Sequence, residues 1–464
     1  MKPLPMVHLS EDALREKEAK YCSYGDTVHY SPAPKFFQNC EGSFLYDRED
    51  KPYLDLQMWY SAVNFGYRNQ TIIDALKAQL DRLPQLACQY LHDEKVLVSE
   101  KLALECLRAF GLEGRIQFNV GGAQAIEDSM KLVRNATGKS QFMAFMGGYH
   151  GRTLGASEIT SSYRYRRRFG HFSNRAHFEP FPYCYRCPYG KTLDSCDYYC
   201  VNQIERLFET EYNSFWDAKA NEAEFVAFYV EPVQATGGYI IPPPEYFARL
   251  QKILREHKIL LVDDEIQMGF FRTGKFWALE HFGVQPDIVV FGKAMTNGLN
   301  PISGVWAKEA LISPAKFPPG STHSTFSSNP LGTAATLATL LWIEQQHYEK
   351  KVMESGAYFL RQIETLKHRH QTIGDVSGLG LALRIEVTKP DRFTPDKILA
   401  DRIFEAGLAG GIPSSRGPMG LVLDIGGHYK NVFTLAPALD ITTDEIDLGI
   451  ELLDYLFTSC TDSK

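Results

Sequence analysis

The chain has 464 residues, with 44% hydrophobic residues and a formal net charge of −7 at pH 7. This length is enough for a main domain plus a smaller one. The mild acidic charge argues against a nucleic-acid surface, which would need clustered positive charge. No secretory signal or uncharged apolar run long enough to span a bilayer is visible. The nine cysteines, an odd number, agree with a reducing compartment. We therefore expect a cytoplasmic protein with no nucleic-acid or membrane partner.

Paired strands are predicted near the N-terminus, after an arm that ends at about residue 35. Residues 44–47 and 52–56 alternate between apolar and polar side chains around a charged turn. Helical periodicity follows at 71–82 and, more strongly, at 94–110.

A glycine-rich turn follows a predicted strand at 115–120 and opens a helix at about 125–134. Its residues are Gly121, Gly122 and Ala123. Such a turn exposes unpaired backbone N–H groups, and the helix dipole there favours an anion. Taken alone, this is a weak indication of a phosphate site.

Two short apolar runs, 259–262 and 288–291, stop abruptly, the first on carboxylates and an amide and the second on a glycine and then Lys293. Bounded apolar runs of this length are typical of strands buried on both faces. Ligands of open α/β sheets bind outside the carboxyl ends of such strands. Asp264, Gln267 and Lys293 are therefore expected to face one crevice. An acid, an amide and a lysine at one crevice suggest a site for a cofactor with a carbonyl and a ring nitrogen.

The segments 260–274 and 286–293, at their fixed spacing, resemble the signature of the class III (ω-type) aminotransferases, which are pyridoxal 5'-phosphate (PLP) enzymes of fold type I. The resemblance implies an α/β fold in which a large domain holds a mainly parallel central sheet. It also implies a smaller α+β domain built from the N- and C-terminal segments. The expected boundaries are 1–80 for the N-terminal segment, 81–342 for the PLP-binding domain and 343–464 for the C-terminal small domain. A homodimer with shared active sites is expected as well.

The resemblance also assigns roles to individual residues. Lys293 is expected to form a Schiff base with the PLP aldehyde and then to move a proton from the substrate carbon to the cofactor carbon. Asp264 is expected to pair with the pyridine nitrogen, because a nearby opposite charge favours the protonated ring. The phosphate is expected to bind the turn of Gly121, Gly122 and Ala123, together with Thr325 from the neighbouring subunit. Tyr149 is expected to stack on the ring, with His150 beside it. Glu231 and Gln267 are the remaining expected cofactor contacts.

Two departures from the family pattern concern the substrate pocket. The family's glutamate and arginine, which form a switchable ion pair in ornithine and 4-aminobutyrate aminotransferases, correspond here to Thr236 and Thr434. The joint replacement of both charged residues is physically consistent, because replacing only one would leave the other as a buried charge without a partner. Carboxylate recognition is then either absent or supplied elsewhere, for example by Arg416. Trp59 and Tyr60 belong to a loop that reaches the substrate pocket in the family.

Cys184, Cys187, Cys196 and Cys200 form Cys-x2-Cys and Cys-x3-Cys pairs, a spacing suitable for tetrahedral zinc. A structural metal, a disulfide and a reduced surface insertion are all compatible with the sequence, and the family mechanism needs no metal.

The sequence therefore predicts a PLP-dependent aminotransferase that moves an amino group from an amine or amino acid to a 2-oxo acid. The alternative is an amino-acid racemase or epimerase on the same scaffold, since some family members with a similar cysteine insertion are racemases. Neither the donor nor the acceptor can be identified from the sequence. An arginine at position 434 is predicted to shift acceptor preference toward dicarboxylates.

Overall fold

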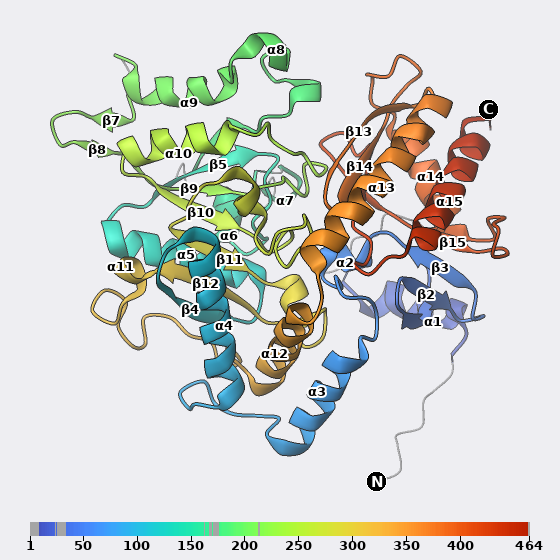
Figure 1. Ribbon diagram of the computed structural model, residues 1–464, viewed down its shortest axis with the longest axis horizontal. Helices are drawn as coiled ribbons and strands as arrows, with labels where there is room; N and C mark the ends of the chain where they lie inside the picture. The colour runs from blue at the N-terminus through green and yellow to red at the C-terminus, as the bar shows by residue number, and fades with distance from the viewer. Residues whose placement is uncertain are drawn as a thin grey trace.

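The computed structural model describes residues 9–23, 25, 34–161, 163–166, 169, 176–211 and 214–462. Two parts lie side by side in Figure 1. One is built around a large sheet from the middle of the chain, and the other combines the N-terminal strands with the C-terminal elements. Helix α2 (Met58–Ser61) lies between the two parts.

A seven-stranded sheet forms the centre of the larger part. All its strands run parallel except β12, which is antiparallel to both of its neighbours. The mainly parallel sheet expected from the sequence is thus confirmed. In spatial order the strands are β4 (Gly114–Asn119), β12 (Ser303–Lys308), β11 (Ile288–Phe291), β10 (Leu260–Asp264), β9 (Phe225–Val230), β5 (Gln141–Met146) and β6 (Ala176–Pro180).

Both faces of this sheet are buried, because strand residues point alternately to opposite sides. In β5, Phe142 and Ala144 pack with Ile126 of helix α5 (Gly122–Thr137). The intervening Met143 and Phe145 belong to the other core, which helices α4 (Asp93–Phe110) and α10 (Tyr246–Glu256) cover. Apolar side chains on both faces explain the continuous hydrophobic runs in the sequence.

The smaller part contains two four-stranded sheets. In the first, Leu54 of β3 pairs in parallel with Leu421 of β15, which joins the two ends of the chain. Its order is β1 (Phe37–Glu41), β2 (Phe44–Asp47), β3 (Pro52–Asp55) and β15 (Gly420–Val422). The second is antiparallel, with the order β13 (Ile373–Leu379), β14 (Ala382–Val387), β17 (Val432–Leu435) and β16 (Asp424–Gly426). The domain boundaries near residues 80 and 342 stay a prediction.

Helix α12 (Pro330–Glu344) begins at a strong capping signal. Asn329 accepts a hydrogen bond from the N–H of Gly332, and proline occupies the first helical turn, where its missing N–H costs nothing. This helix packs on α3 (Gln70–Arg82) and α4. The remaining α-helices of the described residues are α1 (Glu11–Tyr21), α6 (Ala156–Ile159), α7 (Tyr163–Arg166), α8 (Leu193–Cys196), α9 (Tyr199–Glu209), α11 (Glu309–Ile312), α13 (Tyr348–Arg369), α14 (Lys397–Ala409) and α15 (Thr443–Asp462). The 3-10 helices are η1 (Cys184–Arg186), η2 (Ala278–Phe282) and η3 (Lys293–Thr296). A short hairpin pairs β7 (Trp216–Asp217) with β8 (Glu222–Ala223).

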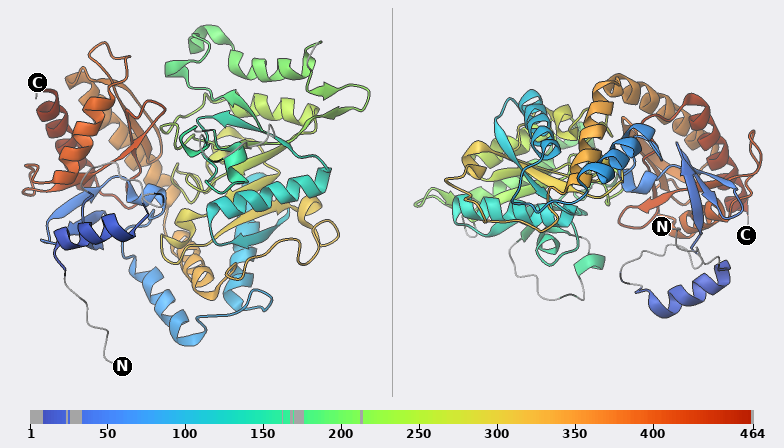
Figure 2. Two further views of the ribbon diagram at one scale, coloured as in Figure 1. Left: turned by 180° about the vertical axis from the view of Figure 1, so that it is seen from behind. Right: turned by 90° about the horizontal axis from the view of Figure 1, so that it is seen from below.

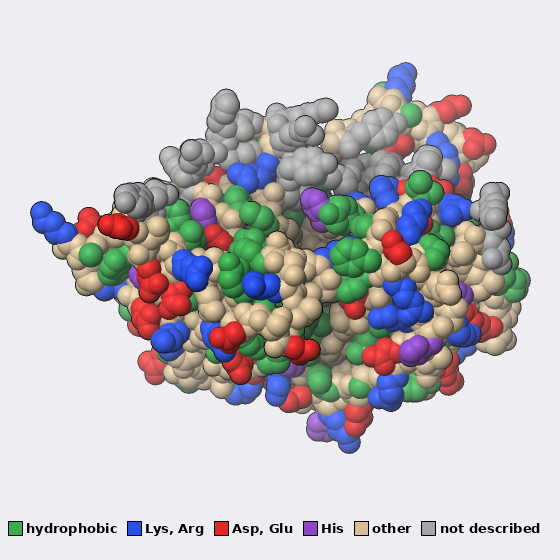
Figure 3. Space-filling model, turned by 90° about the horizontal axis from the view of Figure 1, so that it is seen from above, with side chains coloured by type: hydrophobic (Ala, Val, Ile, Leu, Met, Phe, Trp, Pro, Cys, Tyr) green, Lys and Arg blue, Asp and Glu red, His purple; other side chains and the backbone are tan. Residues whose placement is uncertain are grey.

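The surface is mixed in charge. On the face shown in Figure 3, basic and acidic side chains of the described residues are interspersed, so no field of one sign covers this face. The view from below in Figure 2 shows α1 set apart beneath the smaller part. Within the described ranges, no helix combines the length and the apolar character that a membrane crossing requires.

Candidate active site

A cavity of about 510 Å³ opens at the carboxyl ends of strands β5, β9, β10 and β11. This edge of a parallel sheet is where α/β proteins bind ligands, and the volume lies in the ordinary range for small-molecule sites. The cavity is lined by the start of α5 and by the segments that follow the four strands: Gly122, Ala123, Tyr149, His150, Gly151, Arg152, Thr153, Glu231, Asp264, Ile266, Gln267, Met268 and Lys293.

Lys293 stands two residues beyond the end of β11. Because β10 and β11 are parallel neighbours, with Asp264 paired to Val290, the ends of both strands meet at the cavity. Nζ of Lys293 donates a hydrogen bond to Oε1 of Gln267. Loss of hydration lowers the pKa of Lys293 to about 8, although the negative charges of Asp264 and Glu231 oppose this shift. The amine is therefore easily deprotonated.

The carboxylate of Asp264 is held in place by its neighbours. Oδ2 accepts a hydrogen bond of 2.7 Å from Nδ1 of His150, and Oδ1 accepts one of 3.1 Å from the N–H of Ile266. Burial by itself would lower the pKa of His150, but the hydrogen bond and the charges of Asp264 and Glu231 raise it. His150, which also lines the cavity, thus orients the carboxylate of Asp264. Asp263 points to the opposite face of the sheet, as strand alternation requires.

Glu231 organises the loops rather than presenting a free carboxylate. Its Oε1 accepts from the N–H of Tyr149 at 2.8 Å, and its Oε2 accepts from the N–H of Ala235 at 2.9 Å. Burial raises the pKa of Glu231 to about 7. Tyr149 also lines the cavity, and its ring meets that of Tyr165 edge-on, with 5.3 Å between centroids.

The N-terminus of α5 offers uncapped backbone donors. Gly121 precedes the helix and has no side chain that could cap it. Two glycines keep this end open. A Cβ on Gly151, whose φ is +127°, would lie 2.6 Å from Cβ of Ala123, and one on Gly122 would lie 2.9 Å from Ile266. The result is an anion cradle at the start of a 16-residue helix.

Gln267 connects Lys293 to a tyrosine that the sequence analysis did not single out. Its Nε2 donates to the hydroxyl of Tyr239 at 3.1 Å, while its Oε1 accepts from Lys293. Tyr239 follows the double glycine 237–238, and only 2% of its surface is exposed. Its position after two glycines was the available signal, because glycines often let a neighbouring side chain approach a site closely.

The segment Met58–Ser61 carries the expected substrate-loop residues Trp59 and Tyr60 in an unusual conformation. All four residues have positive φ, between 42° and 62°. A left-handed turn costs roughly 1–2 kcal/mol per residue. Asp55 stabilises its start by accepting from the N–H groups of residues 57 and 58 at 2.7 and 2.9 Å. Backbone strain of this kind concentrates at functional sites.

Thr236 and Thr434, which stand where the family has a glutamate and an arginine, lie in two segments that contact each other around residue 427. The carbonyl of Thr236 accepts from the N–H of Gly427 at 3.1 Å. Thr434, in β17, is 1% exposed, and its hydroxyl donates to Oδ2 of Asp424 at 2.5 Å. Asp424 was not anticipated from the sequence, although a charge closing the apolar run 420–423 was a visible signal.

Besides Gly121, six expected site residues are not among those that line the cavity: Trp59, Tyr60, Thr236, Thr325, Arg416 and Thr434. Arg416 is exposed in the loop between α14 and β15, where its backbone N–H bonds to Ser414, and it is not among the residues that line the cavity. Thr325 is also exposed in the single chain. The other expected cofactor residues lie at the cavity, with Gly121 at its edge.

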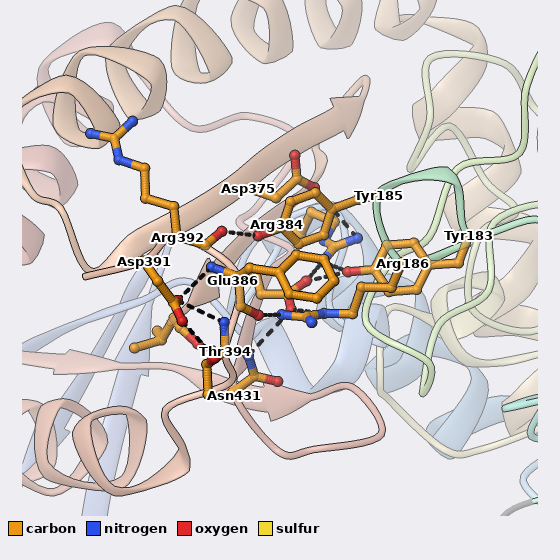
Figure 4. Close-up of polar contacts among 12 residues, drawn as sticks. Tyr183, Tyr185, Arg186, Asp375, Arg384, Glu386, Asp391, Arg392, Thr394 and Asn431 are labelled. Atoms are coloured by element: carbon orange, nitrogen blue, oxygen red, sulfur yellow. Dashed lines mark hydrogen bonds and ion pairs between the residues drawn. The ribbon is translucent and has the colours of Figure 1, made fainter. Parts of the chain in front are cut away.

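The cysteine-containing insertion ties the two parts of the molecule together (Figure 4). Nε of Arg186 donates to Oε1 of Glu386 at 2.5 Å, and the hydroxyl of Tyr183 also contacts Glu386. Arg384 forms an ion pair with the same carboxylate. The tyrosine at position 185 donates to the carbonyl of Arg392. These residues define a polar clasp between the segment 183–186 and strand β14.

All four insertion cysteines are free thiols around one small pocket. In the described part of the chain, which includes all four, no group of three or more His, Cys, Asp or Glu side chains could hold a metal ion. The insertion has a visible structural role without a metal, through the clasp.

Together these features suit a phosphorylated aldehyde cofactor. The amine of Lys293 can bond an aldehyde, Asp264 can counter a ring nitrogen, and the α5 cradle, which a Cβ at residue 151 would fill, can bind phosphate. This donor set on a mainly parallel sheet defines a PLP-dependent enzyme of fold type I.

Comparison with known proteins agrees. The model of the family "Aminotransferase class-III" matches residues 27–457. The chain is 32% identical to a leucine/methionine racemase of Thermococcus litoralis over 96% of this chain and 95% of the other. It is 31% identical to a probable 4-aminobutyrate aminotransferase of Bacillus subtilis, over 89% of this chain and 91% of that protein. A solved amine transaminase from an uncultivated Pseudomonas species, in its PLP-bound form, superposes with a TM-score of 0.84 at 25% identity, covering 95% of this chain and 99% of that one. The chain belongs to the class III aminotransferase family, and it is a PLP-dependent enzyme.

Proposed function

We propose that the chain is an aminotransferase that moves an amino group from an amine or amino acid to a 2-oxo acid. The observation that carries this proposal is the position of Lys293, whose amine lies in the cavity with Asp264 and has its pKa lowered to about 8. A partly neutral amine can act both as a nucleophile and as a proton acceptor near physiological pH.

When bound, PLP supplies an aldehyde for the amine and an electron-withdrawing ring that stabilises negative charge at the substrate carbon. Asp264, oriented by His150, would counter the positive charge of the ring nitrogen. The N–H groups of Gly122 and Ala123 would bind the phosphate, and Tyr149 would cover the ring. Once released, the amine of Lys293 would take a proton from the substrate carbon and deliver it along the same face.

A homodimer in the cytoplasm is part of this proposal. Thr325 is exposed in the single chain, as a residue that completes a neighbour's phosphate site has to be. All nine cysteines are free thiols, which agrees with a reducing compartment.

An amino-acid racemase is the second candidate, favoured by the similarity to the Thermococcus litoralis racemase and by the absence of the charged switch at Thr236 and Thr434. Racemisation needs a second proton carrier opposite Lys293. Both carboxylates that line the cavity, Glu231 and Asp264, are already held by hydrogen bonds. This supports transfer over racemisation.

A spectral experiment separates the two reactions. The PLP-loaded protein is mixed with candidate amino donors in the absence of a 2-oxo acid. Conversion to the pyridoxamine form, with release of a stoichiometric amount of 2-oxo acid or aldehyde, supports transfer. Inversion of an amino acid's configuration without that conversion would refute transfer and support the racemase.

A further inference from the structure

Tyr239 is held in a backbone conformation that a tyrosine seldom adopts. Its φ is +50°, in the left-handed region, where a bulky side chain is strained. The glycines before it let the chain pass closely, since a Cβ on Gly237 would lie 2.1 Å from Oε1 of Gln234. Backbone strain persists where the surroundings demand it, and it concentrates at functional sites. A buried tyrosine at a strained position points to a task for its hydroxyl.

The ring of Tyr239 is fixed by its packing. It belongs to a small apolar cluster at the junction of the two parts of the molecule. Met268 and Ala278 contribute to this cluster from the larger part, and Ala382 and Ala436 contribute from the smaller part. Because the ring is buried among these side chains, its hydroxyl has a defined position.

The hydrogen bonds between Lys293 and Tyr239 have a defined direction. The ammonium of Lys293 can only donate, so Oε1 of the Gln267 side chain faces it. Nε2 of the same amide then faces Tyr239 and donates to its hydroxyl at 3.1 Å. Burial raises the pKa of Tyr239, so the phenol accepts this bond as a neutral hydroxyl. An amide turned the other way round would set two donors against each other at Lys293.

The hydroxyl of Tyr239 is what holds the amide in this orientation. In the described part of the chain, the side chain of Gln267 bonds to Lys293 and Tyr239 and to no other group. A phenylalanine at 239 would leave Nε2 without an acceptor, and the amide could then rotate. Lys293 would lose an oriented acceptor that favours its charged form.

The carboxylates that act on the charge of Lys293 come from three other places. They are Asp264 at the end of β10, Glu231 after β9 and Asp424 in β16. None of the hydrogen bonds that hold them within the described residues involves Tyr239. A phenylalanine at 239 therefore leaves these charges in place, and its effect on the amine passes through the amide.

We propose that Tyr239 is a positioning residue, which orients the amide of Gln267 and through it the amine of Lys293 that bonds PLP. The inference rests on the proposed role of Lys293, and it holds for transfer and for racemisation alike. Tyr239 is not among the residues that line the cavity, so it acts through Gln267 and not on a substrate.

The first test measures the rate at which PLP attaches to the cofactor-free protein as a function of pH. In the wild type the midpoint is expected near 8. In Tyr239→Phe it should fall by at least about 0.5 pH unit, because the charged amine loses an oriented acceptor. The control Tyr246→Phe removes another buried hydroxyl, one without a hydrogen-bond partner in the described residues, and should leave the midpoint as it is. An unchanged midpoint in Tyr239→Phe, or equal shifts in both variants, would overturn the proposal.

The second test is a double-mutant cycle that follows the route from Tyr239 to the amine. Gln267→Leu removes the acceptor of Lys293 and should lower the midpoint at least as far as Tyr239→Phe does. The double variant Tyr239→Phe/Gln267→Leu should have the midpoint of Gln267→Leu, because Tyr239 then has no amide to orient. Additive shifts, or an unchanged midpoint in Gln267→Leu, would show that Tyr239 does not act through Gln267 and would overturn the proposal.

The site of attachment separates this inference from the proposed function. Borohydride reduction and peptide mapping identify the lysine that PLP has bonded in each variant. Attachment at Lys293 with an unchanged midpoint overturns the role of Tyr239 alone. Attachment at another lysine would overturn the proposed role of Lys293 and the inference together.

Discussion

Asp424 and Thr434 form a buried hydrogen-bonded pair whose charge can be changed by substitution. In the wild type the Thr434 hydroxyl donates to Asp424 at 2.5 Å in a buried position. An arginine at 434 would find that carboxylate beside it and form a charge-assisted pair. The single substitution Thr434→Arg should therefore not free an arginine for dicarboxylates. This refines the expectation from sequence, in which Thr434→Arg alone shifts acceptor preference.

In the double variant Asp424→Asn/Thr434→Arg, the arginine has no carboxylate partner at position 424 and should bind an acceptor with two carboxylates. Close charge pairs couple by about 1.5 kcal/mol or more. The kcat/KM for 2-oxoglutarate relative to pyruvate should thus be at least about tenfold higher in the double variant than in Thr434→Arg. Steady-state kinetics of the four proteins form a double-mutant cycle. Additive effects of the two substitutions would refute the pairing, and a tenfold gain in Thr434→Arg alone would show that Asp424 does not hold the arginine.

Three further predictions follow from particular contacts. The rate at which PLP attaches to the cofactor-free protein should rise with pH and level off above about 8, because that is the pKa to which burial lowers Lys293; a midpoint near 10.5, the ordinary lysine value, would contradict the enclosed amine. Arg186→Ala should lower the free energy of unfolding, measured in urea, by about 1–3 kcal/mol, because it removes a hydrogen bond from the buried carboxylate of Glu386. The control Lys252→Ala, at an exposed ion pair within a helix, should change this free energy by less than about 1 kcal/mol. Equal effects of the two substitutions would argue against the clasp. Gly151→Ala should weaken PLP binding at least tenfold, because the new methyl group would collide with Ala123 in the anion cradle, while the secondary structure of the unbound protein should change little. Fluorescence titration measures the dissociation constant, and an unchanged value would place the phosphate elsewhere.

The central sheet could be predicted from the sequence because its signals are local. Each buried strand is a continuous apolar run, and the residue that ends the run is the one that faces the ligand edge. Asp264 and Lys293 come together for this reason alone, since parallel neighbours β10 and β11 end at the same edge. The glycine turn before α5 is equally local.

Contacts between distant strands could not be predicted in this way. The approach of Asp424 to Thr434 depends on the antiparallel register of β16 and β17, which a strand of three residues such as β16 does not specify. The clasp joins Tyr183 to Glu386 across 203 positions of the chain, so no spacing rule could reveal it. The role of Arg416 in binding a carboxylate stays a prediction, and its side chain is exposed in the single chain.

The lysine that holds the cofactor can be identified directly. The PLP-loaded protein is reduced with borohydride, digested and mapped by mass spectrometry. The assignment to Lys293 predicts a single phosphopyridoxyl adduct on the peptide that contains this residue, and loss of that adduct in Lys293→Ala. An adduct on another lysine, or protein that stays colourless and unmodified after incubation with PLP, would contradict it.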